Sequence, residues 1–355
     1  MKRYFAIFVT IAMLTVPRVH GQTAPPLRLV QTIPLPNVDG FLDHMGVDIQ
    51  GQRLFVPTEV QNTVEVVDLR AGKVIHTIKG LKNPHTVLYR PQSKEIFVTD
   101  AQDGTCEVFR GDSYEPVKTI KLAEGADNAA YDPVSQYFYV DIRGQFTKSS
   151  SSLLAIIDTK NSQHLGDIKI EGANTQAMAF EPSGPRMYLD IADKNEIAVI
   201  DREKRAVLTT WPVAEAPWNY TLALDAAHHR LFVGSRMERT YFVPGKMLVL
   251  DSVTGKVISR LDNIGGGADE MFYDPVRQRI YVCGGDGFVD VIKQVDSDHY
   301  QSLGRVATGV LAKTALWVPE LNRLYVAVPQ HQVVVAPMTT GKIEEGKILV
   351  YEAEP

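Results

Sequence analysis

A motif that occurs seven times constrains the fold of this chain more than any other feature. Each copy has a polar residue, a short apolar strand, a turn, and a second strand with the pattern (L/I)(F/Y)V. The most regular copy is "ADEMFYDPVRQRIYVCGGDGFVDV" at 268–291, and "DNAAYDPVSQYFYVD" at 127–141 follows the same pattern. Equivalent positions recur every 42 to 49 residues. This period, with strand–turn–strand signals, predicts a ring of four-stranded blades.

The two ends of the chain are expected to complete one blade together. Repeat seven supplies only three strands, "ALWVP", "NRLYVAVP" and "KILVYEA". The segment "LRLVQTIPLP" at 27–36 alternates like a strand and has no partner nearby in the sequence. We expect it to be the fourth strand, because closing the ring removes exposed sheet edges. The fold class is therefore all-β: a seven-bladed β-propeller of four-stranded blades, closed by the N-terminal strand, in one domain over residues 27–355.

The residues before this strand look like a processing signal. Lys2 and Arg3 precede a short apolar stretch at 4–16, which is too short for a membrane span. We expect a signal peptide over residues 1–21, a polar leader over 22–26, and no transmembrane segment after cleavage. The expected destination is the periplasm or the outside of the cell. Cys106 and Cys283 fall in blades that are not neighbours, so no disulfide is expected.

Composition narrows the range of partners. The formal net charge is -5 among 355 residues, and no block of Lys and Arg stands out. Broad nucleic-acid binding is therefore not indicated. Single-stranded nucleic-acid binding needs aromatic platforms beside a basic groove. One cluster offers this combination: Arg236, Arg239, Tyr241 and Phe242. We rank this function third and expect a monomer.

Two stretches carry a family resemblance. "YDPVRQRIYVCGGDGFVDVI" at 273–292 and "VLDSVTGKVISRL" at 249–261 resemble the YVTN-repeat β-propellers, the YncE-like group of exported bacterial proteins. The resemblance covers essentially all of the chain after the signal segment. It implies a seven-bladed propeller that is exported and usually has no assigned reaction. The chain departs from the regular repeat in three long loops, at 141–153, 234–247 and 329–347.

A polar ring is expected where the innermost strands of the seven blades begin. In a propeller these strands line the central channel, so their first residues meet at its mouth. We expect the long loops to surround the same mouth. A concave pocket with convergent polar groups is the default binding site. The ring residues, with three that follow them directly, are Asp43, His44, His85, Asp127, Asn128, Gln176, Tyr220, Asp269, Glu270 and Lys313.

Three interpretations of this ring remain open. In the first, the polar residues bond only to channel water and backbone. In the second, the ring binds an unknown small molecule or protein, which would make the chain an exported binding or scaffold protein. In the third, a divalent ion is held by some of Asp43, Asp127, Asp269 and Glu270, with His44 or His85 as a base or ligand.

The third interpretation implies a lyase or lactone hydrolase, by analogy with other propellers. Hard carboxylate oxygens would favour Ca²⁺ or Mg²⁺. Lys313 opposes such an ion, because it would neutralise part of the carboxylate charge. The sequence favours binding without a reaction, with no cofactor assigned and no catalytic residue named.

Overall fold

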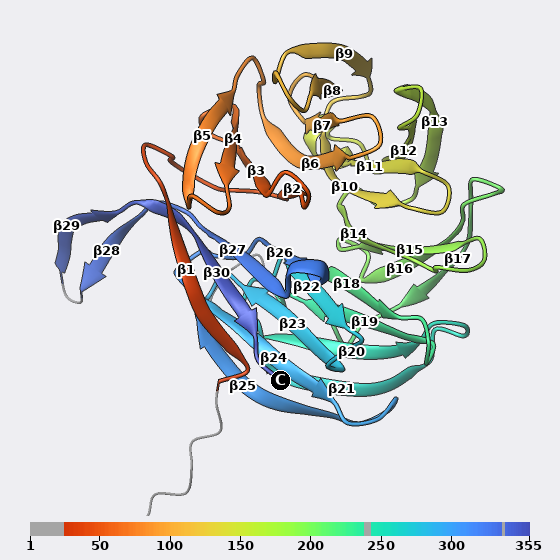
Figure 1. Cartoon of the computed structure of the whole chain (residues 1–355). Helices are drawn as coiled ribbons and strands as arrows, with labels where there is room; N and C mark the ends of the chain where they lie inside the picture. The colour runs from red at the N-terminus through yellow and green to blue at the C-terminus, as the bar shows by residue number, and fades with distance from the viewer. Residues whose placement is uncertain (1–24, 238–242, 336–337) are drawn as a thin grey trace, which may run out of the picture.

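The computed structural model describes residues 25–237, 243–335 and 338–355, and within them the strands form a seven-bladed β-propeller (Figure 1). Blade 1 contains β2 (Gly46–Asp48), β3 (Arg53–Thr58), β4 (Thr63–Asp68) and β5 (Lys73–Ile78). Blade 2 contains β6 (Pro84–Arg90), β7 (Glu95–Asp100), β8 (Thr105–Arg110) and β9 (Pro116–Lys121). Blade 3 contains β10 (Ala126–Asp132), β11 (Tyr137–Ile142), β12 (Ser152–Asp158) and β13 (Gln163–Ile170).

The remaining blades continue around the ring in chain order. Blade 4 contains β14 (Thr175–Phe180), β15 (Arg186–Ile191), β16 (Glu196–Asp201) and β17 (Ala206–Pro212). Blade 5 contains β18 (Asn219–Asp225), β19 (Arg230–Ser235), β20 (Gly245–Asp251) and β21 (Val257–Ile264). Blade 6 contains β22 (Glu270–Asp274), β23 (Arg279–Gly284), β24 (Phe288–Gln294) and β25 (Tyr300–Ala307).

Blade 7 closes the ring as the sequence predicts. It contains β26 (Ala315–Val318), β27 (Arg323–Val328), β30 (Gly346–Ala353) and β1 (Leu27–Leu35). β1 pairs antiparallel with β30, from Leu27 opposite Ala353 to Leu35 opposite Gly346. The two strands lie side by side at the red and blue ends of the chain in Figure 1. The expected all-β propeller, with four-stranded blades and an N-terminal closing strand, is confirmed.

The core lies between neighbouring blades rather than inside any one of them. Phe97 and Val108 of blade 2 pack in one cluster with Val140 and Ile157 of blade 3, and all four are buried. Each blade thus buries both faces of its sheet, which explains why the inner strands are apolar runs rather than alternating patterns. The apolar core and its cohesion come from this stacking around the ring.

The Asp-Pro turns after the innermost strands have the expected chemistry. Asp132 Oδ1 accepts a hydrogen bond from the Val134 N–H at 3.0 Å, and Asp274 Oδ1 accepts one from the Val276 N–H at 3.0 Å. Each carboxylate thus bonds the backbone two residues on, which fixes the turn. Gln136 then takes a φ of 61° as the chain enters the second strand.

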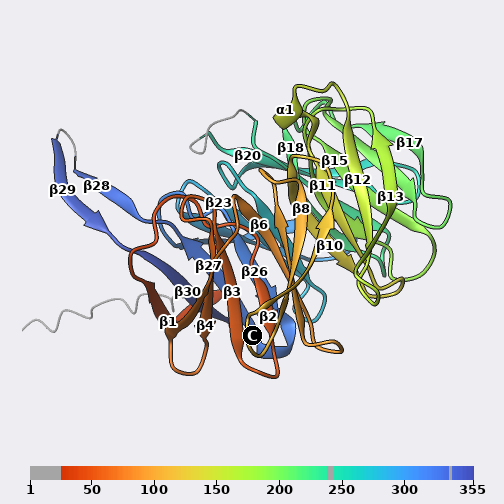
Figure 2. The same ribbon diagram turned by 90° about the horizontal axis from the view of Figure 1, so that it is seen from above.

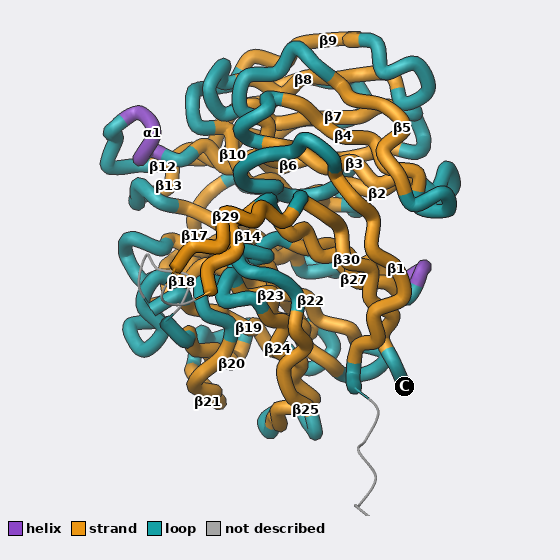
Figure 3. Tube along the Cα trace, turned by 90° about the vertical axis from the view of Figure 1, so that its left-hand side faces the viewer, coloured by secondary structure: helices purple, strands orange, loops and turns teal. Residues whose placement is uncertain are grey.

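Helical structure is confined to two short segments of the described chain (Figure 3). They are α1 (Gly144–Thr147) and the 3₁₀ turn Pro319–Leu321. Within the described residues, no helix has the length and hydropathy needed to cross a membrane. The long loop at 329–347 contains a hairpin, β28 (His331–Val335) and β29 (Met338–Glu344), which projects away from the ring (Figures 1 and 2). This hairpin is not anticipated from the sequence.

Candidate functional site

The mouth of the channel is a polar cavity of about 250 Å³. Seven of the ring positions named from the sequence line it, together with His44, so the blades bring these eight residues around one cavity. Six further residues complete the lining. The full set is Phe41, Asp43, His44, Glu59, Asn83, His85, Asp127, Arg143, Phe146, Gln176, Tyr220, Arg236, Asp269 and Lys313.

Blades 1 to 3 contribute a side of the mouth that is rich in carboxylates. His85 Nδ1 lies 2.5 Å from Asp43 Oδ2 and 3.5 Å from Asp127 Oδ1. The other ring nitrogen, Nε2, lies 3.0 Å from Asn83 Oδ1. Glu59 follows β3 and faces the same cavity. We call Asp43, Glu59, His85 and Asp127 the acidic arc: three carboxylates grouped around one imidazole.

Blades 5 to 7 contribute two positively charged side chains to the other side of the mouth. Both Arg236 and Lys313 form ion pairs with Asp269. Arg236 also lies over the ring of Tyr220, 3.4 Å from its centroid, and Lys313 lies 5.4 Å from the centroid of Phe41. Such cation–π contacts hold a cation in place and keep part of its charge available to a further ligand.

Arg143 joins the two sides. It comes from the loop after β11 and forms an ion pair with Asp127. Its Nη1 also donates to the Tyr220 hydroxyl at 3.4 Å, and its guanidinium lies 5.1 Å from the ring centroid of Phe146. We call Arg143, Arg236 and Lys313 the basic arc. Gln176 lies between the arcs and donates to Asn174 Oδ1 at 2.6 Å.

Asp43, Asp269 and Lys313 in the mouth are each stabilised in the ionised form by neighbouring groups of the opposite charge. Burial raises the pKa of Asp43, but the nearby His44 and His85 reverse this and leave that pKa well below its usual range. Burial likewise raises the pKa of Asp269, and Arg236 and Lys313 outweigh it, so the net shift is downward. The pKa of Lys313 is raised, because the charges of Asp269 and Asp43 outweigh its burial.

Glu59 differs from its neighbours. Burial and the charge of Asp43 both raise its pKa. Glu59 therefore takes up a proton more readily than Asp43 as the pH falls.

His44 forms the floor of the mouth. Its Nδ1 lies 2.5 Å from Glu270 Oε1 and its Nε2 lies 3.5 Å from Asp43 Oδ1. Burial lowers the pKa of His44, but the charges of Asp43 and Glu270 overcome this and raise it to about 9. His44 is therefore an imidazolium at neutral pH, and it separates the mouth from a second cavity deeper in the channel.

Two of the predicted ring residues lie below the mouth rather than in it. Asn128 and Glu270 line the deeper cavity, and neither lines the mouth. Each follows a mouth residue by one position, and one residue advances a strand by about 3.3 Å along the channel. From the sequence, these two residues were therefore assigned to the correct strands but placed in the mouth, whereas they line the deeper cavity.

Of the four carboxylates proposed from the sequence as ion ligands, Asp43 and Asp127 remain candidates, and Glu59 joins them. Two groups have ligand atoms within 4.8 Å of one another: Asp43 with His44 and Asp127, and Asp43 with Glu59 and His85. Asp269 and Glu270 belong to neither group. Asp269 is paired with two cations and Glu270 with His44, so their oxygens are already used.

Sequence reasoning missed three charged residues of the mouth. Glu59, Arg143 and Arg236 each directly follow the second strand of their blade, in blades 1, 3 and 5. The same position holds Ala101, Ala192, Gly285 and Pro329 in the other blades. This position is charged in blades 1, 3 and 5 and is alanine, glycine or proline in the other four blades. That contrast is a signal from which the three charged residues could have been identified.

The basic cluster considered for single-stranded nucleic acid is only partly described. Arg236 lies in the mouth and pairs with Asp269. Arg239, Tyr241 and Phe242 lie outside the described residues. Cys106 and Cys283 are buried free thiols, as expected.

The chain has detectable similarity to two curated proteins. It is 27% identical to the uncharacterised protein YncE of Salmonella typhi over 112 residues, which cover 32% of this chain and 31% of that protein. The YncE of Salmonella typhimurium is 26% identical over a segment of the same length. The aligned segment thus spans about a third of the length of these relatives. No family model matches the chain.

Two solved structures that share the fold are distant from this chain in sequence. A chain of hydrazine synthase from Kuenenia stuttgartiensis superposes with a TM-score of 0.68 at 16% identity, covering 88% of this chain and 96% of that one. A chain in the crystal structure of the mitotic checkpoint complex gives a TM-score of 0.71 at 12% identity, covering 98% and 99%. At these identities the likeness shows the fold alone. The YncE match and the seven-bladed architecture together support a YncE-like propeller family.

Proposed function

Because the chain is a YncE-like propeller, we propose that it is a binding protein whose channel mouth holds a small ligand with charges of both signs, such as an amino acid. The observation that carries this proposal is the separation of charge across one cavity of about 250 Å³. The acidic arc would receive an ammonium group, and the basic arc would receive a carboxylate.

The free-energy cost of burying the charged residues of the mouth supports a role in binding. Asp43, His85, Asp127, Asp269 and Lys313 are all less than a tenth exposed. Burying ion pairs costs several kcal/mol per charge before their attraction is counted, and apolar replacements are often neutral or stabilising. A propeller does not need this arrangement to fold, whereas buried and strongly shifted charges cluster at functional sites.

A melting-temperature screen tests this function. The protein is heated with amino acids, simple carboxylates and simple amines at equal ionic strength. Ligands that bind only the folded state stabilise it by about 2.7 kcal/mol at a hundred times their Kd. We expect compounds with both charges to raise the melting temperature and compounds with one charge to have little effect. Equal shifts for all three classes would contradict a two-sided site.

Divalent-metal binding is the second candidate function, supported by the two ligand groups around Asp43. Both combine imidazole and carboxylate, a donor set that suits zinc or manganese as well as magnesium. A metal there would polarise a bound carbonyl, as a lyase or lactone hydrolase requires. The ion pair between Arg143 and Asp127 argues against a metal ion there, because it already neutralises one of the carboxylates that would bind the ion.

Metal content decides between the two candidates. The purified protein is subjected to elemental analysis and melted with and without a chelator. The binding proposal predicts less than a tenth of an equivalent of metal and no chelator effect. A stoichiometric ion with a chelator-sensitive melt, lost in Asp43→Asn, would favour the metal-dependent function.

We also propose that the protein is exported. The support is the sequence pattern of residues 1–21, with Lys2 and Arg3 before a short apolar stretch. Intact-mass measurement of the protein from a periplasmic or culture fraction is expected to give a chain that begins at Gln22. A full-length chain confined to the cytoplasm would contradict export.

A further inference from the structure

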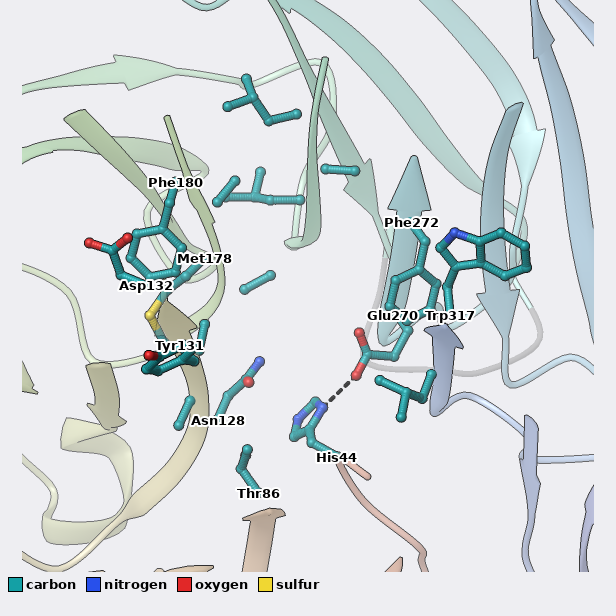
Figure 4. Close-up of a pocket in the computed structure, with 18 of the residues that line it drawn as sticks. His44, Thr86, Asn128, Tyr131, Asp132, Met178, Phe180, Glu270, Phe272 and Trp317 are labelled. Carbon is teal, nitrogen blue, oxygen red and sulfur yellow. Dashed lines mark hydrogen bonds and ion pairs between the residues drawn. The ribbon is translucent and has the colours of Figure 1, made fainter. Parts of the chain in front are cut away.

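The channel contains a second cavity below His44, with a volume of about 590 Å³ (Figure 4). The innermost strands of blades 2 to 7 contribute to its wall, and blade 1 contributes His44 and Met45, which directly precede β2. This volume is within the range of about 300–1,000 Å³ that is typical of small-molecule pockets. We call it the lower cavity, and it lies beyond the mouth discussed above.

The wall of the lower cavity is mainly apolar and aromatic. Tyr131, Met178 and Phe180 lie on one side of the space, and Phe272 and Trp317 lie on the other (Figure 4). Facing aromatic side chains favour a flat apolar body between them, in stacked or edge-to-face contact. Methionine adapts to ligands of irregular shape because its side chain is unbranched and polarisable.

The charged groups that border this cavity are already paired. His44 pairs with Glu270 at 2.5 Å. At the other end, Asp132 pairs with Arg202 at 2.6 Å, and Glu181 accepts a hydrogen bond from the Tyr188 hydroxyl at 2.7 Å. An anion would lose its water without gaining a counter-charge, because both cations beside the cavity, His44 and Arg202, are already ion-paired. The wall therefore favours an uncharged molecule over an anion.

Asn128 provides one polar contact point. Its carboxamide extends into the cavity near His44 (Figure 4). Its side chain is partly exposed, and it forms no hydrogen bond with any residue that the structure describes. A carboxamide offers both a donor and an acceptor. An unpaired amide at the inner end of an apolar cavity is an anchor for one neutral hydrogen-bonding group.

We propose that the lower cavity is a ligand site for an uncharged, largely apolar small molecule with an aromatic or similarly flat body and one hydrogen-bonding group. The body lies between the two aromatic sides, and the polar group bonds to Asn128. This site is independent of the mouth, since the paired His44 and Glu270 lie between them. It therefore does not rest on the function proposed for the mouth.

N-phenyl-1-naphthylamine, a neutral aromatic amine with one N–H group, is a suitable probe. Its fluorescence is titrated with the full protein, and we expect saturable binding at one molecule per chain. Anilinonaphthalene sulfonate has similar rings and a negative charge, and we expect it to bind at least tenfold more weakly. No saturable binding of the neutral probe, or equal affinity for the anion, would overturn the proposal.

Two variants locate the probe. Ala130 lines the cavity and belongs to none of the core clusters among the described residues, so Ala130→Trp fills the space without displacing the core. We expect at least a tenfold loss of probe affinity. Val253→Trp adds the same side chain at a site that is 48% exposed, and there we expect no more than a twofold change. Equal affinity in both variants would place the probe elsewhere and overturn the proposal.

Asn128→Ala keeps the test decisive if Ala130→Trp unfolds the protein. It removes the amide from a partly exposed position that makes no hydrogen bond within the described chain, so we expect an unchanged melting temperature. We expect probe affinity to fall three- to tenfold because the N–H contact is lost. An affinity equal to that of the wild type would overturn the role of Asn128 and, with it, the proposed orientation.

Discussion

Two buried carboxyl groups outside the mouth stand out at the scale of single residues. Asp141 accepts a hydrogen bond from the Thr175 hydroxyl across the boundary between blades 3 and 4. Asp190 Oδ1 accepts one from Asn219 Nδ2 at 2.5 Å, across the next boundary. Neither has exposed surface, and burial raises the pKa of both well above the ordinary range.

Asp141→Asn and Asp190→Asn are expected to change how stability depends on pH. A raised folded-state pKa means that the stability contributed by the carboxyl is fully present below the unfolded pKa, near 3.9, and declines as the pH rises through the folded pKa. An asparagine does not titrate and still accepts the cross-blade hydrogen bond. The variants should gain about 1.4 kcal/mol over the wild type for each pH unit in which only the folded carboxyl is protonated.

Urea unfolding of the wild type and both variants from pH 4 to pH 9 measures this difference. Asp158→Asn is the control, because Asp158 is the last residue of β12 and accepts a hydrogen bond from the Lys160 N–H at 2.8 Å near the surface. Parallel stability curves for Asp141→Asn and the wild type would show that the carboxyl is not held neutral in the fold.

The sequence predicted individual residues of the site unevenly. Asp43, His85, Asp127 and Asp269 were predictable because each occupies the same position of a repeat, and the symmetry of a propeller brings such positions together. Arg143 and Arg236 were missed because they follow the second strand of their blades, a position that is singled out only when it is compared across all seven blades. The pairing of His44 with Glu270 could not be predicted from the sequence either, because it joins blades 1 and 6 through side-chain geometry alone.

At the scale of secondary-structure elements, β1 is the one that closes the ring. Ile33 and Leu35 on this strand are fully buried, and they pack with Leu54 and Val56 of blade 1. The strand therefore joins blade 7 both to its own sheet and to the next blade. Its loss would expose a sheet edge and an apolar blade face together.

Ile33→Ala tests this role of β1. Removing a fully buried isoleucine typically costs about 2–5 kcal/mol through lost burial and the cavity that remains. Leu29→Ala is the matched control on the same strand, because Leu29 is 49% exposed, and surface changes usually stay within about 0.5 kcal/mol. The free energy of unfolding in guanidinium measures both variants. Equal losses in the two would mean that ring closure does not depend on burial of β1.

Most elements were predictable because their sequences carry both local and repeating signals. The (L/I)(F/Y)V strands and the Asp-Pro turns recur in register, so each copy supports the interpretation of the others. The hairpin of β28 and β29 lacks this support. It interrupts the path from β27 to β30, and no other blade has a counterpart among the residues that the structure describes. A single irregular insertion offers no internal comparison from which to infer its structure.

At the scale of the whole molecule, the channel has two chemically distinct parts. The mouth is charged, with an acidic arc and a basic arc, and the wall of the lower cavity is mainly apolar and aromatic. The division follows from the repeat, because each innermost strand begins with a polar residue and continues with apolar ones. The ring of seven blades converts one sequence pattern into two layers of a single channel.

Calorimetric titration of the mouth tests the central claim most directly. The wild type is titrated with the amino acid that raises its melting temperature most, beside Lys313→Met and His85→Asn. Lys313→Met removes one charge of the basic arc and leaves Asp269 paired with Arg236, and His85→Asn alters the acidic arc. The account predicts one site per chain and at least a tenfold loss of affinity in each variant. Undetectable binding by the wild type, or unchanged affinity in both variants, would contradict it.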